Sequence, residues 1–169
     1  RELRRRLEAL YRRYDQRFVT PDPLEFVRAQ RTAADREVVG LVASGLAFGT
    51  VVQIKRSVAA VLAVLGEAPA EAVARLDPVA AAARLAGFRH RWVDGRDVAA
   101  LLFLVRQMRA SHGSVEAFFA EGLCAGDEDV GPALSSFSAR ALALDHGGLY
   151  PGRRLPRDAG VRYFFPSPA

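Results

Sequence analysis

The stretch that most constrains the fold is residues 35–66, DREVVGLVASGLAFGTVVQIKRSVAAVLAVLG. Its spacing predicts two helices that meet at Gly49, the first apolar on nearly every side and the second apolar on one face. A helix that is apolar all round must be enclosed by other helices, so we expect this pair at the centre of a helical domain. Asp35 is the predicted N-cap of the first helix, and Thr50 and Gly66 are the predicted ends of the second.

The rest of the chain predicts amphipathic helices that cover this pair. They are expected at residues 2–15, just after Pro23, at 69–76, 78–86 and 94–111, after Ser114, and at 132–145. Proline and glycine interrupt the helical period after Gly147, so we expect a loop-rich tail whose Tyr163, Phe164 and Phe165 dock on the helices. The prediction is an all-α, orthogonal domain of about eight helices around a central apolar helix pair, with a loop-rich C-terminal tail.

The two ends of the chain suggest a fragment. It begins with Arg1 rather than methionine and stops soon after an apolar cluster, so we expect residues 1–169 to be one helical domain of a longer protein. The longest uncharged apolar run, Val38 to Val52, is shorter than the ~20 residues that a membrane-spanning helix needs. One cysteine, Cys124, excludes an internal disulfide, and no secretory signal is visible. We expect a cytoplasmic protein without a membrane partner.

The charge balance permits binding to nucleic acid. The formal net charge is +5 and the sequence pI is about 10.1. Lys55 is the only lysine, and the other basic residues are arginines. The coding bias of a GC-rich genome explains this arginine use without any selected surface, and we favour it over a nucleic-acid-binding surface. The arginines of residues 2–15 have the same two interpretations, a solvated helix face or a strip that contacts phosphates.

Two segments carry the candidate nucleic-acid-binding residues. The helix that begins at Thr50 presents Gln53, Lys55 and Arg56 near its N-terminus, where free N–H groups favour an anion. The second segment contains the only tryptophan beside cationic groups, Arg89, His90, Arg91 and Trp92. Such a cluster can stack on a base and hold its phosphate. The competing interpretations are an ordinary exposed helix face and, for the second segment, Phe88 and Trp92 packed inward with the three polar residues outward.

Catalytic patterns are absent from the sequence. It contains no GxGxxG, Walker, HExxH or GxSxG pattern, and its three histidines are widely scattered. The acidic residues next to Cys124 disfavour a thiolate nucleophile, and the acidic loop at 127–129 lacks the spacing of a calcium loop. We predict no catalytic residue, no metal site and no cofactor from these patterns.

Several blocks resemble an uncharacterised bacterial family of unknown function, number 2400. They are Pro21-Asp22-Pro23-Leu24-Glu25-Phe26, Asp35 with Glu37, Leu46-Ala47-Phe48-Gly49 with Gln53-Ile54, residues 88–92, and Phe164-Phe165-Pro166-Ser167-Pro168. The family continues past this chain into a basic segment that is distantly similar to helix-hairpin-helix DNA glycosylases. The glycine-rich hairpin and the catalytic lysine and aspartate of those enzymes are absent here. The resemblance therefore implies an all-helical fold and a connection with DNA, but no catalytic residue.

These observations leave two main hypotheses for the function. The first is a nucleic-acid-binding helical domain, related to DNA repair and glycosylase-like, in which Lys55, Arg56, Arg89 and Arg91 share one surface. The alternative is a non-catalytic helical domain that binds a protein partner or acts as a scaffold, with an exposed apolar groove. A small-molecule enzyme would need a polar pocket with perturbed titratable groups, and the sequence predicts none.

Overall fold

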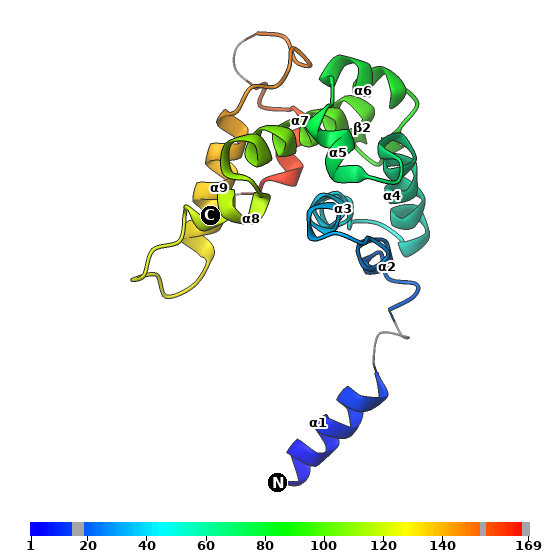
Figure 1. Cartoon of the computed structure of the whole chain (residues 1–169), viewed down its shortest axis with the longest axis vertical. Coiled ribbons are helices and arrows are strands. Elements are labelled where there is room, and N and C mark those ends of the chain that lie inside the picture. The colour runs from blue at the N-terminus through cyan, green and yellow to red at the C-terminus, as the bar shows by residue number, and fades with distance from the viewer. Residues whose placement is uncertain (15–18, 153–154, 167–169) are drawn as a thin grey trace.

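The computed structural model describes residues 1–14, 19–152 and 155–166, and helices dominate it (Figure 1). Two short strands, β1 (Arg89–His90) and β2 (Val93–Asp94), pair antiparallel, and a 3-10 helix, η2 (Gly160–Phe164), lies in the tail. The helices are α1 (Glu2–Arg13), α2 (Leu24–Arg28), α3 (Ala33–Gly45), α4 (Val51–Leu65), α5 (Pro69–Ala74), α6 (Pro78–Arg84), α7 (Gly95–His112), α8 (Val115–Ala120) and α9 (Gly131–Ala143). The all-α prediction is confirmed, apart from the small hairpin.

Some sequence predictions fall outside the described part of the chain. These are the helix end expected at Asp15 and the last residues of the family resemblance, Ser167 and Pro168. Along the described segments, every helix is too short or too polar to cross a lipid bilayer.

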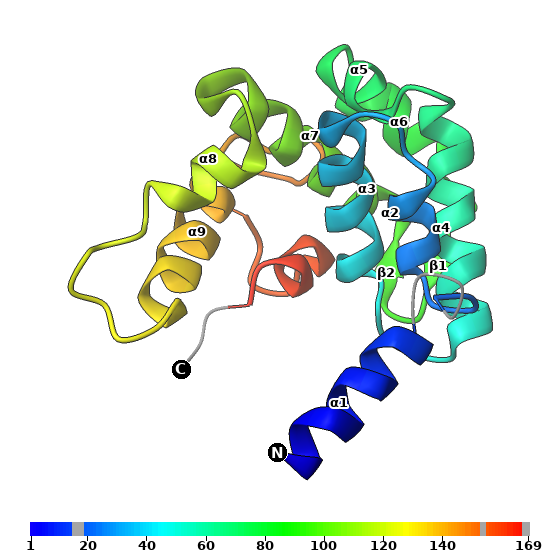
Figure 2. The ribbon, with the colours of Figure 1, turned by 60° about the horizontal axis from the view of Figure 1, so that its bottom comes forward.

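The helix that the other elements surround is α7. Its buried side chains include Leu101, Leu102, Leu104 and Met108, and it packs against α5, α6, α8 and η2. The predicted pair, α3 and α4, forms one side of this core, where Val38, Val42, Val58 and Val61 are buried. Figures 1 and 2 show that α3, α4 and α7 run in different directions, so the helices do not form a parallel bundle.

The first helix of the central pair differs from its prediction at both ends. The N-cap is Thr32, whose side chain accepts a hydrogen bond from the Asp35 backbone N–H, so Asp35 lies in the first turn. The helix ends at Gly45, and Gly49 lies in the linker before α4. A Cβ at Gly45 would lie 2.7 Å from Cδ1 of Phe164, so this glycine leaves room for an aromatic ring of the tail.

The tail docks on the helical body only in part as predicted. Phe164 and Phe165 are buried, which confirms that prediction. Tyr163 is 59 % exposed and contacts the ring of Trp92 in the hairpin turn rather than a helix. The three residues lie at the end of a 3-10 helix, whose tight turn points neighbouring side chains in different directions.

A buried carboxylate fixes the start of α7. The Asp97 side chain accepts a hydrogen bond from the Asp94 backbone N–H at 3.0 Å, and the Asp94 side chain caps the helix in return. Asp97 also accepts a hydrogen bond from the Tyr150 hydroxyl at 2.6 Å. Burial, and then this bond to Asp97, raise the pKa of Tyr150 far above its usual range, so the hydroxyl keeps its proton. A Cβ at Gly160 would overlap the same carboxylate, so the tail packs directly against it.

A second buried carboxylate, Asp35, joins α3 to α5. It accepts a hydrogen bond from the Thr32 hydroxyl at 2.5 Å and from the Ala70 backbone N–H at 2.9 Å. The bond from Thr32, then the bond from Ala70, lower the pKa of Asp35, with a smaller contribution from the charge of Arg109. The ionised carboxylate therefore stabilises the first turns of two helices at once.

Helix α1 stands away from the body of the molecule (Figure 1). None of its residues is buried, and Leu3, Leu7, Leu10 and Tyr14 share one exposed face. A 12-residue helix is marginally stable alone in water, so contact of Leu3, Leu7 and Leu10 with another apolar surface would stabilise it.

Replacing Asp35 with alanine should destabilise the fold by about 1–3 kcal/mol at pH 7, because a hydroxyl and an N–H lose their acceptor. The pKa of Asp35 is lowered on folding, so its stabilisation is complete above the unfolded pKa of about 4 and disappears as the pH falls through the folded pKa. Urea denaturation at pH 7, 4 and 3 measures the difference between the variant and the original chain. The exposed Glu67→Ala serves as the control. An equal difference at pH 7 and pH 3 would contradict the role of the charge.

Candidate nucleic-acid interface

The hairpin that follows α6 positions most of the candidate residues. Arg89 pairs with Asp94 and His90 with Val93, so Arg91 and Trp92 form a two-residue turn. Arg91 has φ +53°, in the left-handed region that hairpin turns of this length require. Side chains alternate along β1, with Arg89 exposed and His90 buried. The competing interpretation is therefore wrong for two residues, since Trp92 is exposed and His90 is buried.

His90 ties the hairpin to the helical body. Its side chain is 3 % exposed, with Nε2 2.8 Å from the carbonyl oxygen of Phe48 and Nδ1 2.8 Å from the hydroxyl of Ser57. The carbonyl can only accept, so Nε2–H donates to it, and Nδ1 accepts from the hydroxyl of Ser57. Because both ring nitrogens are occupied inside the protein, His90 positions the hairpin rather than contacting a ligand.

Five of the candidate residues, Gln53, Arg56, Arg89, His90 and Arg91, line one hollow of about 390 Å³ between α4 and the hairpin. We call it the arginine hollow. It is lined by Gln53, Arg56, Ser57, Ala60, Gly87, Phe88, Arg89, His90 and Arg91. No aspartate or glutamate belongs to this lining, so the charge around the hollow is positive.

The arginines of this hollow have no counter-ion within the described residues. Arg56, Arg89 and Arg91 are all exposed, and none of them takes part in an ion pair with the described carboxylates. In contrast, Arg109 and Arg140 are paired with glutamates elsewhere. Three free guanidinium groups on one hollow favour binding of an anion such as phosphate.

At the N-terminus of α4, the predicted anion site, some backbone N–H groups are already hydrogen-bonded within the protein. Thr50 accepts a hydrogen bond from the Gln53 N–H at 3.4 Å, and the Gln53 side chain accepts from the Thr50 N–H at 3.5 Å. A Cβ at Gly49 would lie 3.3 Å from Nε of Arg91, so the tip of the hairpin packs over this helix start. An anion here would therefore be held by arginine side chains more than by free N–H groups.

Lys55 does not join the arginine hollow. Its Nζ lies 2.7 Å from Oε1 of Glu25 on α2, and Glu25 also accepts a hydrogen bond from Thr20. The bond from Lys55, then the bond from Thr20, lower the pKa of Glu25. Lys55 and Arg56 are adjacent in a helix, so their side chains leave it in different directions. Of the four basic residues expected on one surface, the structure brings three together around this hollow.

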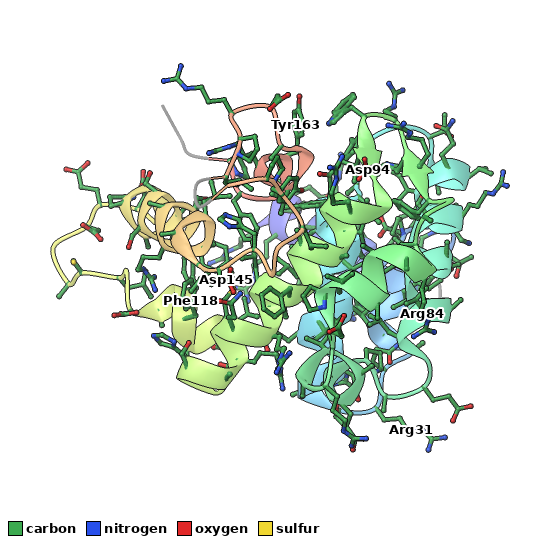
Figure 3. All side chains as sticks on the ribbon, turned by 90° about the horizontal axis from the view of Figure 1, so that it is seen from above. Arg31, Arg84, Asp94, Phe118, Asp145 and Tyr163 are labelled. Atoms are coloured by element: carbon green, nitrogen blue, oxygen red, sulfur yellow. The ribbon has the colours of Figure 1, made fainter. Side chains whose placement is uncertain are left out.

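Trp92 lies in an aromatic cluster beside the hollow. Its ring stacks on Phe48, with centroids 4.8 Å apart and planes 11° apart, and its centroid lies 5.3 Å from that of Tyr163. We call these three residues the aromatic cluster. Trp92 remains 49 % exposed. Figure 3 shows Tyr163 and Asp94 in the upper half of the view, and Arg31 at the bottom.

Sequence reasoning missed the residues that complete this site. Phe48 follows the end of α3 and Tyr163 comes from the tail, far from Trp92 in the sequence. Ser57 looked like an ordinary polar helix position. No local pattern links these residues to the hairpin, because only the packing of four separate segments brings them together.

The acidic loop between α8 and α9 has a structural explanation. The Asp127 side chain accepts a hydrogen bond from the Cys124 N–H, and the Asp129 side chain accepts one from the Gly131 N–H. Both carboxylates therefore stabilise turns of their own loop, and Cys124 is exposed beside them.

Comparison with known families identifies the chain. Residues 22–168 match a family described as "Protein of unknown function (DUF2400)", and the chain belongs to that family. The matched segment contains the hairpin, the arginine hollow and the aromatic cluster, while α1 lies outside it. No curated protein and no solved structure matches the chain significantly.

Replacing His90 with leucine should destabilise the domain, because the Phe48 carbonyl and the Ser57 hydroxyl lose their hydrogen-bond partner. Each unsatisfied group should lower the free energy of unfolding by about 1–3 kcal/mol. Ser57→Ala removes only one of these bonds and should cost less. Urea denaturation followed by the fluorescence of Trp92 measures both variants. If His90→Leu is as stable as the original chain, His90 does not anchor the hairpin.

Proposed function

We propose that this DUF2400 domain binds nucleic acid, with a phosphate of the backbone in the arginine hollow. The observation that carries the proposal is the grouping of Arg56, Arg89 and Arg91 around one hollow whose lining contains no carboxylate. A guanidinium group donates two parallel hydrogen bonds to phosphate oxygens, so three of them suit a phosphodiester backbone.

The wider surface and charge support the same class of ligand. The aromatic cluster adjoins the hollow, since Arg91 and Trp92 are consecutive residues of one turn. The formal net charge of +5 favours approach of a polyanion. These features go together in proteins that bind nucleic acid through phosphates and exposed bases.

DNA repair is the more specific form of this proposal. It rests on the distant similarity between helix-hairpin-helix glycosylases and the family's later segment, past this chain, and it makes the chain a binding module of a repair protein. Incubation of the chain with oligonucleotides that contain damaged bases, followed by alkaline cleavage, tests for glycosylase activity. Strand cleavage only at the damaged base would support it, and intact strands would leave the chain a binding module.

Replacing the three hollow arginines with alanine should weaken binding of single-stranded DNA and flatten its salt dependence. Each phosphate contact contributes about 0.7 to the log–log salt slope for a single strand, so the slope should fall by about 2. Fluorescence anisotropy with a labelled 12-nucleotide DNA at several salt concentrations measures both quantities.

A matched control removes the same charge from other surfaces. Arg28, Arg31 and Arg84 are exposed, and none of them lines the arginine hollow. Their triple alanine variant should keep most of the affinity. Equal losses in the two triple variants would mean that net charge alone drives binding, and no binding by the original chain at low salt would refute the proposal.

The exposed face of α1 favours the alternative, a helical domain that binds a protein partner. Leu3, Leu7, Leu10 and Tyr14 follow the spacing of a coiled-coil seam, and Tyr11 beside them is 85 % exposed. Arginines such as Arg6 and Arg13 border this face, so two copies of α1 would repel each other. The partner that fits is an apolar helix bordered by acidic residues.

A designed peptide tests this alternative directly. A helical peptide with leucine at its seam and glutamate at the flanking positions should bind the chain, and a peptide with lysine at those flanks should not. Leu7→Asp should abolish the binding, because it places a charge in the seam. Isothermal titration calorimetry measures the affinity of each peptide for the original chain and for Leu7→Asp. Equal binding of the two peptides, or none, would contradict a role for α1 in recognising an acidic helix.

A further inference from the structure

The aromatic cluster presents open ring surface to solvent beside the arginine hollow. Trp92 and Tyr163 are 49 % and 59 % exposed, while Phe48 is partly buried beneath Trp92. Large aromatic side chains are usually mostly buried, since burial of their apolar surface stabilises the fold. Two neighbouring rings left half open on the same edge are therefore a surface that a flat apolar ligand can cover.

The cluster is held in place before any ligand binds. Phe48 packs edge-on against His90, with centroids 4.5 Å apart, and its carbonyl oxygen accepts the hydrogen bond from His90. The Trp92 ring in turn stacks on Phe48. Tyr163 is carried by η2, which is in contact with β2 and α7. Phe48 is thus held by buried His90, and Trp92 is held between Phe48 and Tyr163, so ordering these rings around a ligand costs little side-chain entropy.

Charge separates two parts of this edge. The arginine hollow is positive, and Trp92 does not line it. Trp92 lines a second hollow, which contains the carboxylates of Asp94, Asp97 and Asp158 beside Arg96. Oδ2 of Asp94 lies 3.6 Å from Nη2 of Arg96, so this carboxylate offsets the positive charge of Arg96. Phosphate is therefore attracted to the arginine side of Trp92 and repelled from the other. A nucleotide that places its phosphate in the arginine hollow would bring its uncharged base toward the rings.

We propose that the exposed rings of Trp92 and Tyr163 form a stacking platform for an unpaired base, so the domain prefers single-stranded or locally unpaired nucleic acid to a duplex. This inference rests on the proposed function, because the phosphate in the arginine hollow places the base. In a duplex the faces of the bases are stacked on one another and are not available to protein rings.

The single tryptophan makes the platform directly observable. Trp92 is the only tryptophan of the chain, so its fluorescence reports on this site alone. The probes are a 12-nucleotide oligothymidylate, an abasic tetrahydrofuran oligonucleotide with the same number of phosphates, and a blunt duplex. Oligothymidylate should bind more tightly than the abasic strand and the duplex, and it alone should quench the fluorescence strongly.

Variants of the platform provide a second readout. Trp92→Ala should weaken oligothymidylate binding about 5- to 150-fold, as expected for loss of one stacked base, and leave abasic-strand binding unchanged. Trp92→Phe should restore part of the affinity, and Tyr163→Ala should weaken binding in the same direction. Tyr11→Ala removes an exposed aromatic ring of α1 and should change nothing. Anisotropy measures the affinities, and circular dichroism confirms that each variant is folded.

The outcomes separate this inference from the proposed function. Equal binding of the oligothymidylate and the abasic strand, without quenching, would overturn the stacking platform while phosphate binding stands. Tighter binding of the duplex would also overturn it. If no probe binds at low salt, the proposed function fails, and the stacking platform fails with it.

Discussion

The carboxylate of Asp97 is the constraint on which the arrangement of the molecule depends. It accepts hydrogen bonds from the backbone N–H of Asp94 and the hydroxyl of Tyr150, and Gly160 packs against it. These contacts join the end of the hairpin, the start of the most buried helix and the C-terminal tail. A buried carboxylate without such partners would be costly, so its bonds fix where all three segments meet.

The candidate interface follows from a hairpin that is anchored at both strands. Asp94 ends β2 and is held by Asp97, while His90 in β1 is held by Phe48 and Ser57. Between these anchors lie Val93, which pairs with His90, and the two turn residues, Arg91 and Trp92. An exposed turn on a fixed base is a common way to present binding residues, because the scaffold supplies stability and the turn supplies chemistry.

Local patterns predicted much of the fold but less of the site. The caps at Thr50, Asp94 and Ser114 were correct, because a capping side chain acts within three residues of itself. The cap at Asp35 was wrong, since Thr32 three residues earlier takes that role and frees the carboxylate to reach Ala70. For the site, we expected Lys55 and Arg56 on one surface because they are adjacent in sequence. In the structure Lys55 instead forms an ion pair with Glu25.

By itself, the sequence determined the helical class, the positions of the helices, the family and the surplus of positive charge. Each of these depends on composition or on residues a few positions apart. Only the tertiary structure decided that α7 occupies the centre, that His90 is buried, and that Trp92 meets Phe48 and Tyr163. The physical reason is that burial and stacking depend on contacts between distant segments, and helical or strand periodicity carries no information about which segments meet.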